Sequence, residues 1–567
     1  MDYSGRFSYL FRKHTLIRLV CSVALVAVIM TAIFLIGFRN KPVPEIDSIV
    51  PSVGSPGDVI VIKGKNFGDV RDMSYVEFAG SKLTASSYIS WQDDVIKLVL
   101  PSNIQDGLVV VGVKNQRSKP ALFANEVDIP VPVTESFQIT KPVISSLSSS
   151  KLSVGALLTI YGNNFGASRG QSKVYFTSDY DKAVSGAEYV TTTLLTGNMI
   201  PASEFDDDYE YWNNNEIRVR VPDGAYSGVV LVDTGREKSD PVDFTVVSSA
   251  GTKTYTGKKI YLVQYTADVS DVVTTDVSTI TLRCPTPVIV PSQPSLEFTE
   301  ITPSPILQNY QNCIIHQITK NRNNSPKSVF RQSFAVTVYE TATDVKVTGV
   351  GNYKNMNSVL YDKYTKPDSI ILSDNSSIVE LAAEIVGKET NPHKKAKLIY
   401  SYMLEKYAVI SRLRNNDSNP LDMLLFSSGD AYEYAVIFAS LSRAAGIPTL
   451  IDSGILIGQD LSTQAHWWNE IYLTGFGWFP VDAALGAGLE YKKWADTFEP
   501  SEYYFGNLDA HHITFSRGYS ELKPFTQDNK TVKYPKSFAL QSIWEEASSN
   551  TAKYSSYWSV PSIKGVY

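Results

Sequence analysis

Two stretches of the chain repeat the same alternation of apolar and polar positions. GDVIVIKGKNFG (Gly57–Gly68) aligns with GALLTIYGNNFG (Gly155–Gly166), and WQDDVIKLVLP (Trp91–Pro101) aligns with WNNNEIRVRVP (Trp212–Pro222). Alternation of this kind predicts half-buried strands, and Gly-x-Asn-Phe-Gly predicts a tight turn that needs positive φ. The repeat therefore predicts two consecutive β-sandwiches.

A third β-rich region follows the repeat. KKIYLVQY, VSTITLRC and SFAVTVYETATDVKV alternate over several residues each, which predicts a further sheet or sandwich. Cys284 and Cys313 lie in this region. A disulfide between them would close a loop of about 30 residues and contribute ~3 kcal/mol in the chain-entropy model. Two buried free thiols are the alternative.

After this region the apolar positions recur with the period of a helix. Ser377–Glu380 has the form of a capping box, and Asn391–Pro392 has the form of a second helix start. A third helix is predicted in SSGDAYEYAVIFASLSRAAGIP, where Asp430 caps the N-terminus and Gly446 and Pro448 end it. The later segment KSFALQSIWEEAS is expected to form a short helix.

Two strands, QAHWWNEIYL and GFGWFPVDAALG, come after this helix and are predicted to pair as a hairpin. If Asp482 lies opposite Trp468, its carboxylate is diagonal to His466 on the same face, at ~7 Å between Cα atoms. A register shifted by one residue would put the two side chains on opposite faces.

The segment from Gly429 to Asp482 resembles the core of the transglutaminase-like superfamily, which has a papain-like fold. The family pattern falls on these residues: Gly429, Tyr434, Ala435, Arg443, Ala444, Gly446, Ile447, Pro448, His466, Trp468, Asn469, Glu470, Gly477, Trp478 and Asp482. The resemblance implies that His466 is the general base and Asp482 its orienting partner. The family's nucleophilic cysteine falls on Ala431, whose methyl group cannot attack a carbonyl.

The repeated sandwiches resemble the IPT/TIG family of immunoglobulin-like domains, which act as spacers and binding modules. The second copy carries an insertion that ends in an acidic patch of Glu204, Asp206, Asp207 and Asp208. We expect a solvated loop there, and a calcium site is the alternative.

An apolar run without charge extends from Leu19 to Phe38, long enough to cross a bilayer as a helix. Arginines and lysine precede it, so the charge bias places the N-terminus in the cytoplasm and the rest of the chain outside. A cleaved signal peptide is the alternative, but no small-x-small cleavage site follows.

Composition excludes several classes of function. The net charge is −6 with no basic cluster beyond the N-terminus, so no nucleic-acid partner is expected. Three cysteines are too few for a thiolate metal site, and His511 and His512 would face opposite sides of a strand. We therefore expect no metal and no cofactor.

The predicted fold class is multidomain, with a single N-terminal transmembrane helix, two immunoglobulin-like β-sandwiches, a β-rich domain and an α+β papain-like domain. The predicted parts are a cytoplasmic N-terminus (1–15), the transmembrane helix (16–38), IPT/TIG domains (44–138 and 139–250), the β-rich domain (256–370), the transglutaminase-like domain (371–545) and a C-terminal tail (546–567).

These features predict a membrane-anchored bacterial envelope protein whose transglutaminase-like domain is not catalytic. Its expected partner is an envelope protein or a peptidoglycan peptide, bound against Trp467, Trp468 and Trp478. One alternative is an active acyltransferase or peptidase with an unexpected nucleophile such as Ser427 or Ser428. Another is a purely structural surface or adhesion protein.

Overall fold

The computed structural model separates into two units, residues 1–128 and 129–567, which are described here one at a time. The structure describes residues 43–54, 58–72, 74–83, 85–100, 107–114, 116–125, 141–170, 172–178, 199–321, 328–353, 359–492, 498–525, 529–548 and 551–567. The predicted transmembrane helix at 16–38 lies outside the described residues. Among those that are described, no helix is long and apolar enough to span a membrane.

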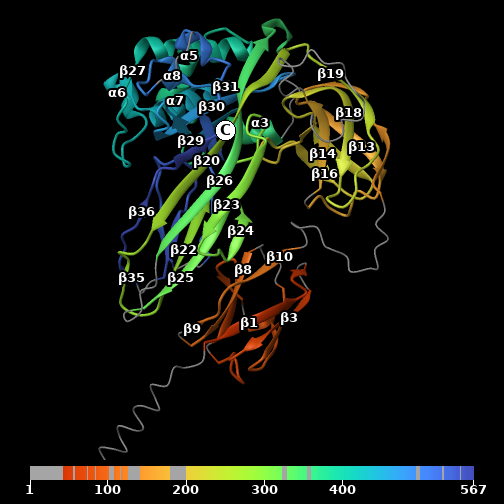
Figure 1. The fold of residues 1–567 in the computed structure, drawn as a ribbon, viewed down its shortest axis with the longest axis vertical. Coiled ribbons are helices and arrows are strands. Elements are labelled where there is room, and N and C mark those ends of the chain that lie inside the picture. The colour runs from red at the N-terminus through yellow and green to blue at the C-terminus, as the bar shows by residue number, and fades with distance from the viewer. Residues whose placement is uncertain are drawn as a thin grey trace, which may run out of the picture. The chain divides into compact units, whose positions relative to one another are not determined.

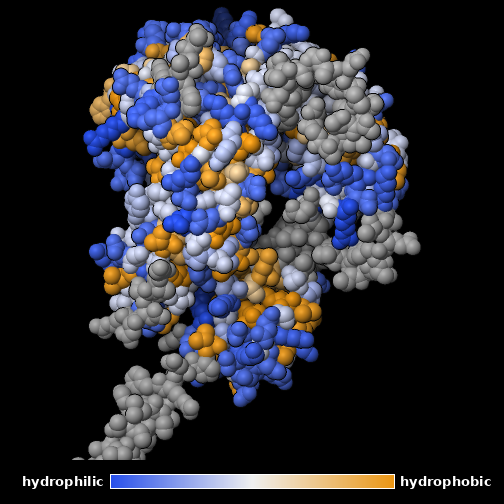
Figure 2. Space-filling model, in the orientation of Figure 1, coloured by the Kyte–Doolittle hydropathy of each residue, from blue (hydrophilic) through white to orange (hydrophobic). Residues whose placement is uncertain are grey.

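The first unit is a sandwich of two sheets (Figure 1). One sheet has the order β1 (Glu45–Val50), β3 (Val59–Lys65), β7 (Val95–Val99), β6 (Tyr88–Trp91). The other has the order β2 (Val53–Gly54), β10 (Ala121–Asn125), β8 (Gly107–Val113), β4 (Tyr75–Phe78), β5 (Ser81–Lys82), with β9 (Gln116–Arg117) beside β8. Val50, Val59 and Leu122 are exposed apolar side chains of this unit, and Figure 2 shows apolar residues gathered on part of it.

The second sandwich repeats this order, and the two sandwiches predicted from the sequence repeat are confirmed. Its sheets are β11 (Val143–Leu147), β13 (Leu157–Asn163), β17 (Glu216–Arg220), β16 (Tyr209–Trp212) and β12 (Lys151–Ser153), β19 (Val242–Val247), β18 (Ala225–Asp233), β14 (Lys173–Ser178), β15 (Met199–Pro201). The repeat extends to single contacts. The Trp91 indole donates to the Phe67 carbonyl at 3.0 Å, and the Trp212 indole donates to the Phe165 carbonyl at 3.1 Å.

Two long strands, β20 (Gly251–Asp268) and β26 (Val329–Val345), form the centre of the third β-rich region. With β23 (Ser295–Thr302) they make one sheet, which faces a second sheet of β24 (Leu307–Tyr310), β25 (Cys313–Lys320) and β22 (Ser278–Pro285). Tyr265 of β20 and Phe334 of β26 belong to one apolar core, which Trp544 from the C-terminal region joins.

The C-terminal residues complete these sheets, so the predicted tail and the predicted short helix are wrong. β33 (Lys530–Val532) and β34 (Glu545–Ala547) extend the second sheet, β36 (Tyr557–Trp558) and β37 (Ser562–Val566) pair with β20, and β35 (Thr551–Lys553) pairs with β21 (Val273–Thr274). These pairings join segments far apart in sequence, which no local pattern encodes. Figure 1 shows the blue C-terminal strands alongside the yellow-green ones.

The predicted disulfide is also wrong, because both cysteines are free and buried. Cys284 lies directly opposite Ile314, whereas Cys313 lies opposite Pro285. Successive residues of a strand point to opposite faces, so this offset of one residue puts the two thiols on opposite sides of the sheet. Cys313 donates to Gln541 at 3.3 Å, and burial raises the pKa of its thiol to about 12.

The α+β part combines helices with a four-stranded antiparallel sheet. The sheet order is β31 (Gly477–Val481), β30 (Thr463–Leu473), β29 (Thr449–Ile457), β32 (His512–Arg517). The helices are α3 (Val359–Thr365), α4 (Ser376–Val386), α5 (Pro392–Lys406), α6 (Asp422–Phe426), α7 (Ala431–Ala444), α8 (Ala483–Gly486) and α9 (Pro500–Tyr503), and a short parallel pair is formed by β27 (Ala408–Val409) and β28 (Ser428–Gly429).

Helix starts follow local sequence closely. Asn391 caps α5 and Pro392 is its first residue, as predicted. In α4 the cap is Asn375, which accepts from the Ser377 amide, so the N-cap lies two residues earlier than the predicted box at Ser377. α7 lies in the middle of the largest apolar core, with buried side chains on every side.

The acidic patch of the second sandwich is not a solvated loop. Asp206 pairs with Arg517 of β32 at 2.7 Å, and Asp207 accepts from the Tyr364 hydroxyl of α3 at 2.8 Å. Asp208 is buried and accepts from the Ser203 amide. The patch thus joins the second sandwich to the α+β part through charges that the sequence alone could not pair.

Candidate functional site

The N-terminus of α7 is fixed by a complete capping box. The Asp430 carboxylate accepts from the Glu433 amide at 2.9 Å, and the Glu433 carboxylate accepts from the Asp430 amide at 3.1 Å. Ala431 is the first helical residue and is 4% exposed. Local sequence therefore places Ala431 where helix amides and the helix dipole would favour a thiolate.

Two cations neutralise the buried carboxylates of this box. Lys536, from the C-terminal region, places Nζ 2.8 Å from Asp430 Oδ2. Arg414 places Nη1 2.9 Å from Glu433 Oε2 and also donates to the Ser428 hydroxyl at 3.0 Å. Neither cation belonged to the sequence-predicted site, because nothing near Arg414 or Lys536 in the chain indicates their partners.

The hairpin has the register that the sequence predicted. Asn469 pairs with Val481, so Asp482 comes level with Trp468. His466 Nε2 lies 2.6 Å from Asp482 Oδ2, and both side chains are fully buried. The remaining ring nitrogen, His466 Nδ1, is buried and has no hydrogen-bond partner among the residues that the structure describes.

Asp482 has a second structural role and a second imidazole. Its Oδ1 accepts from the Leu485 amide at 2.9 Å as the N-cap of α8. Its Oδ2 also lies 3.3 Å from His512 Nε2. Burial raises the pKa of Asp482, but the electrostatic interaction with His466 and the hydrogen bonds from both imidazoles outweigh it and hold this pKa below its usual range.

His512 is held from its other side by Asp509. His512 Nδ1 lies 2.8 Å from Asp509 Oδ1, while the Tyr504 hydroxyl donates to Asp509 Oδ2 at 2.8 Å. His511 faces elsewhere, 3.0 Å from the Tyr261 hydroxyl. Sequence reasoning placed the two histidines on opposite faces, yet it missed that one of them reaches Asp482.

His466, Asp482 and His512 could together offer three ligand atoms to a metal, since these atoms lie within 4.8 Å of one another. Two imidazoles and a carboxylate suit zinc and similar ions. The 2.6 Å contact between His466 and Asp482 has the length of a hydrogen bond, whereas two ligands of one zinc ion lie more than ~3 Å apart. The geometry therefore describes a hydrogen-bonded chain.

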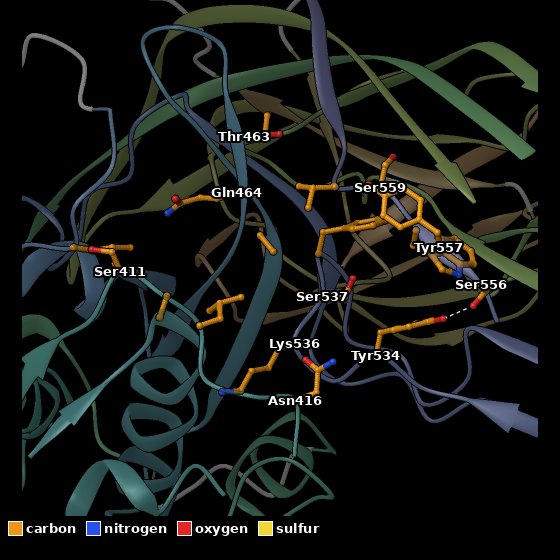
Figure 3. A pocket seen from close by; sticks show the side chains of 17 residues that line it. Ser411, Asn416, Thr463, Gln464, Tyr534, Lys536, Ser537, Ser556, Tyr557 and Ser559 are labelled. Atoms are coloured by element: carbon orange, nitrogen blue, oxygen red, sulfur yellow. Dashed lines mark hydrogen bonds between the residues drawn. The ribbon is translucent and has the colours of Figure 1, made fainter. Parts of the chain in front are cut away.

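A cavity of about 490 Å³ opens beside Ala431 (Figure 3). Its walls come from the segment before α6, the start of α7, the start of β30 and the C-terminal segments 534–538 and 556–560. The lining residues are Ser411, Leu413, Asn416, Ala431, Thr463, Gln464, Ala465, Leu489, Tyr534, Lys536, Ser537, Phe538, Ser556, Tyr557, Trp558, Ser559 and Val560. Gln464 and Ala465 immediately precede His466, so the cavity joins the first residue of α7 to the strand that carries the histidine.

The three predicted binding tryptophans do not line this cavity. Trp467, Trp468 and Trp478 are at most 2% exposed. Trp467 packs on Tyr432 of α7, and the Trp478 amide donates to Asp223 of the second sandwich at 3.0 Å. Their proposed role as a ligand surface is wrong, because both faces of this sheet are covered by other parts of the fold.

The two serines considered as replacement nucleophiles are also outside the cavity. Ser427 is exposed in the left-handed conformation that ends α6. The Ser428 hydroxyl accepts from Arg414, and neither serine lines the cavity. No hydroxyl within the described ranges bonds to His466 Nδ1.

Family models match three parts of the chain. Residues 379–483 match the transglutaminase-like superfamily core, and residues 44–124 and 142–246 match the IPT/TIG domain. The chain therefore carries a transglutaminase-like core preceded by two IPT/TIG domains.

Matches to individual proteins are partial. An uncharacterized protein of Haemophilus influenzae is 30% identical over 188 residues, which cover 28% of this chain and 51% of that protein. A cyclomaltodextrin glucanotransferase of Paenibacillus macerans is 35% identical over 71 residues, 12% of this chain and 10% of the enzyme. The chain thus spans about half of the first relative and a tenth of the second.

Solved structures resemble parts of the fold. A proposed cysteine protease from Cytophaga hutchinsonii covers 55% of this chain and 93% of its own, with 14% identity and a TM-score of 0.34. The periplasmic domain of TgpA from Pseudomonas aeruginosa covers 42% of this chain and 88% of its own, with 13% identity and a TM-score of 0.25.

Proposed function

We propose that this chain is a membrane-anchored protein of the bacterial envelope whose transglutaminase-like domain binds a polypeptide and does not catalyse acyl transfer. The proposed polypeptide is an envelope protein or a peptidoglycan peptide. The anchor is the predicted transmembrane helix at 16–38, and the IPT/TIG domains link it to the α+β part. The bulk of the chain then lies on the periplasmic side of the inner membrane.

The observation that carries the proposal is the combination of Ala431 with an unoccupied imidazole nitrogen. The first position of α7 carries a methyl group, although the capping box and the His466–Asp482 hydrogen bond of a triad are both present. His466 Nδ1, the nitrogen that Asp482 leaves free, bonds to no described group. The base and its orienting partner persist without a nucleophile to activate.

An enzyme with a different nucleophile would need a hydroxyl within hydrogen-bond reach of the base. Ser556 bonds to the Tyr534 hydroxyl, and the Thr463 hydroxyl donates to the Pro561 carbonyl. Ser427 is exposed at the end of α6, and the Ser428 hydroxyl accepts from Arg414. Among the described residues, the alternative hypothesis of an active enzyme therefore has no hydroxyl held against His466.

A polypeptide suits the cavity because one wall is a strand edge. β31 pairs with β30 only at Asn469–Leu473, and within the described residues no strand covers the same edge at Gln464–Ala465. An extended peptide adds to such an edge through main-chain hydrogen bonds, while side-chain pockets select its sequence. Asn416 and Gln464 supply amides in the wall, and Tyr557, 67% exposed, supplies an aromatic ring.

The binding test uses the purified full-length chain in detergent, with stem peptides released from peptidoglycan and peptide arrays of envelope proteins as probes. We expect a specific peptide to bind and Tyr557→Ala and Gln464→Ala to weaken it tenfold or more. Tyr211→Ala is the matched control, because Tyr211 is an exposed tyrosine of the second sandwich outside the cavity.

Two outcomes would contradict the proposal in different ways. Amine incorporation or peptide hydrolysis by the unmodified chain, abolished by His466→Ala, would establish an active enzyme. Failure to bind any peptide, with Tyr557→Ala and Tyr211→Ala behaving alike, would favour a purely structural surface protein.

A further inference from the structure

His512 lies between two carboxylates that belong to different segments. Its Nε2 is 3.3 Å from Asp482 Oδ2 and its Nδ1 is 2.8 Å from Asp509 Oδ1, and its side chain is 1% exposed. A carboxylate can only accept, so each ring nitrogen must carry a proton for both contacts to be hydrogen bonds. The contacts therefore select the imidazolium form of His512.

The surrounding charges favour the same form. Burial lowers the pKa of His512, but the charge of Asp509 and the hydrogen bonds to both carboxylates outweigh it and raise this pKa to about 9. Asp452 of β29 is a further acidic group within electrostatic range. His511 is the neighbouring base, and burial lowers its pKa to about 4, so it adds no competing positive charge at neutral pH.

The imidazolium of His512 weakens the stabilisation that Asp482 can give to a positive charge on His466. In a triad the carboxylate orients the base and stabilises the imidazolium that forms on it. Here the same oxygen, Oδ2, faces both imidazoles, and the ring centres of His466 and His512 are 5.6 Å apart. A fixed positive charge at this distance opposes a second one on His466.

We propose that His512 is a positioning residue that holds Asp482 in place and compensates its negative charge. Asp482 then no longer stabilises a positive charge on His466, so the site lacks this stabilisation as well as a nucleophile. This proposal rests on the proposed function, in which the core is a transglutaminase-like site without catalysis. At an effective dielectric constant of about 20, the repulsion between two unit positive charges 5.6 Å apart corresponds to about a hundredfold change in an equilibrium constant.

The first test reads the protonation state of His512 in the unmodified chain and in one variant. The protein has six histidines, so the full-length chain labelled with ¹⁵N-histidine gives few ring signals to assign. We expect the signals of His512 to report an imidazolium from pH 5 to about pH 8. Asp509→Asn should lower its titration midpoint by one unit or more. A neutral His512 at pH 7 would overturn the proposal.

The second test measures the charge at the site directly. In A431C, the pH dependence of alkylation by iodoacetamide at position 431 is read by peptide mass spectrometry and compared with that of A431C/H512Q. Removal of the positive charge should favour a thiolate–imidazolium pair and lower the alkylation midpoint by about two pH units. A431C/H511Q is the matched control, because His511 faces Tyr261 instead of Asp482.

An unchanged or higher midpoint in A431C/H512Q, with far-ultraviolet circular dichroism unaltered, would overturn the proposal. Tight binding of Zn²⁺ that requires both His466 and His512 would also overturn it, because the metal would then take the place of the protons shared by His466, Asp482 and His512. Neither result depends on whether a peptide binds, so failure of this proposal can be told apart from failure of the proposed function.

Discussion

Arg517 is the group whose loss should most weaken the contact between the second sandwich and the α+β part. Its side chain is 3% exposed and lies within 2.7 Å of Asp206, 2.8 Å of Glu470 and 3.5 Å of Asp452. Arg517→Met keeps the apolar stem and removes the charge, which leaves three carboxylates without their shared cation. Breaking a buried ion pair from one side costs about 3–5 kcal/mol.

The stability lost in Arg517→Met should depend on pH, and the carboxyl groups around Arg517 determine whether the loss is larger at high or at low pH. Burial raises the pKa of Asp206 to about 7, and burial raises that of Asp452 as well. A carboxyl whose pKa is higher in the folded state stabilises the fold at low pH, and this contribution is lost as pH rises through the folded value. Arg517→Met should therefore cost about 3–5 kcal/mol at pH 8 and less than half of that at pH 5.

The assay is urea-dependent hydrogen exchange of the full-length chain, read on peptides that cover β16 and β32. Arg331→Met is the matched control, because Arg331 is 46% exposed and pairs with a similarly exposed Glu300. This surface pair should contribute about 0–1 kcal/mol at either pH. Equal costs for Arg517→Met at pH 5 and pH 8, or a cost below that of the control, would refute the reasoning.

Three further outcomes follow from the site and its surroundings. Asp430→Ala should cost about 3–5 kcal/mol in urea unfolding, because it leaves a lysine ammonium buried, whereas Asn375→Ala should cost about 1 kcal/mol as a simple cap loss. Cys284 and Cys313 should resist alkylation until denaturant is added, and reduction should leave the mass unchanged; a shift of two mass units would show a bridge. Tyr557→Ala should change the free energy of unfolding by less than about 0.5 kcal/mol, and a larger loss would show that the ring supports the fold instead of the cavity.

The sequence by itself determined the features that short segments encode. The repeat around Gly-x-Asn-Phe-Gly predicted two β-sandwiches, and Asp430 predicted the start of α7. The hairpin from His466 to Asp482 followed from strand alternation and one turn, and its register is the predicted one. Each of these depends on dihedral preferences, capping or pairing between residues close together in the chain.

Only the tertiary structure decided which charges and surfaces meet. It paired Asp206 with Arg517, brought Lys536 to Asp430 and His512 to Asp482, and covered Trp478 with the second sandwich. These contacts join residues that are 30 apart in the chain for His512 and Asp482 and 255 apart for Trp478 and Asp223. Burial and charge compensation select such contacts after the local elements exist. A sequence shows that a charged or aromatic side chain is present, but its partner and its exposure depend on how those elements pack.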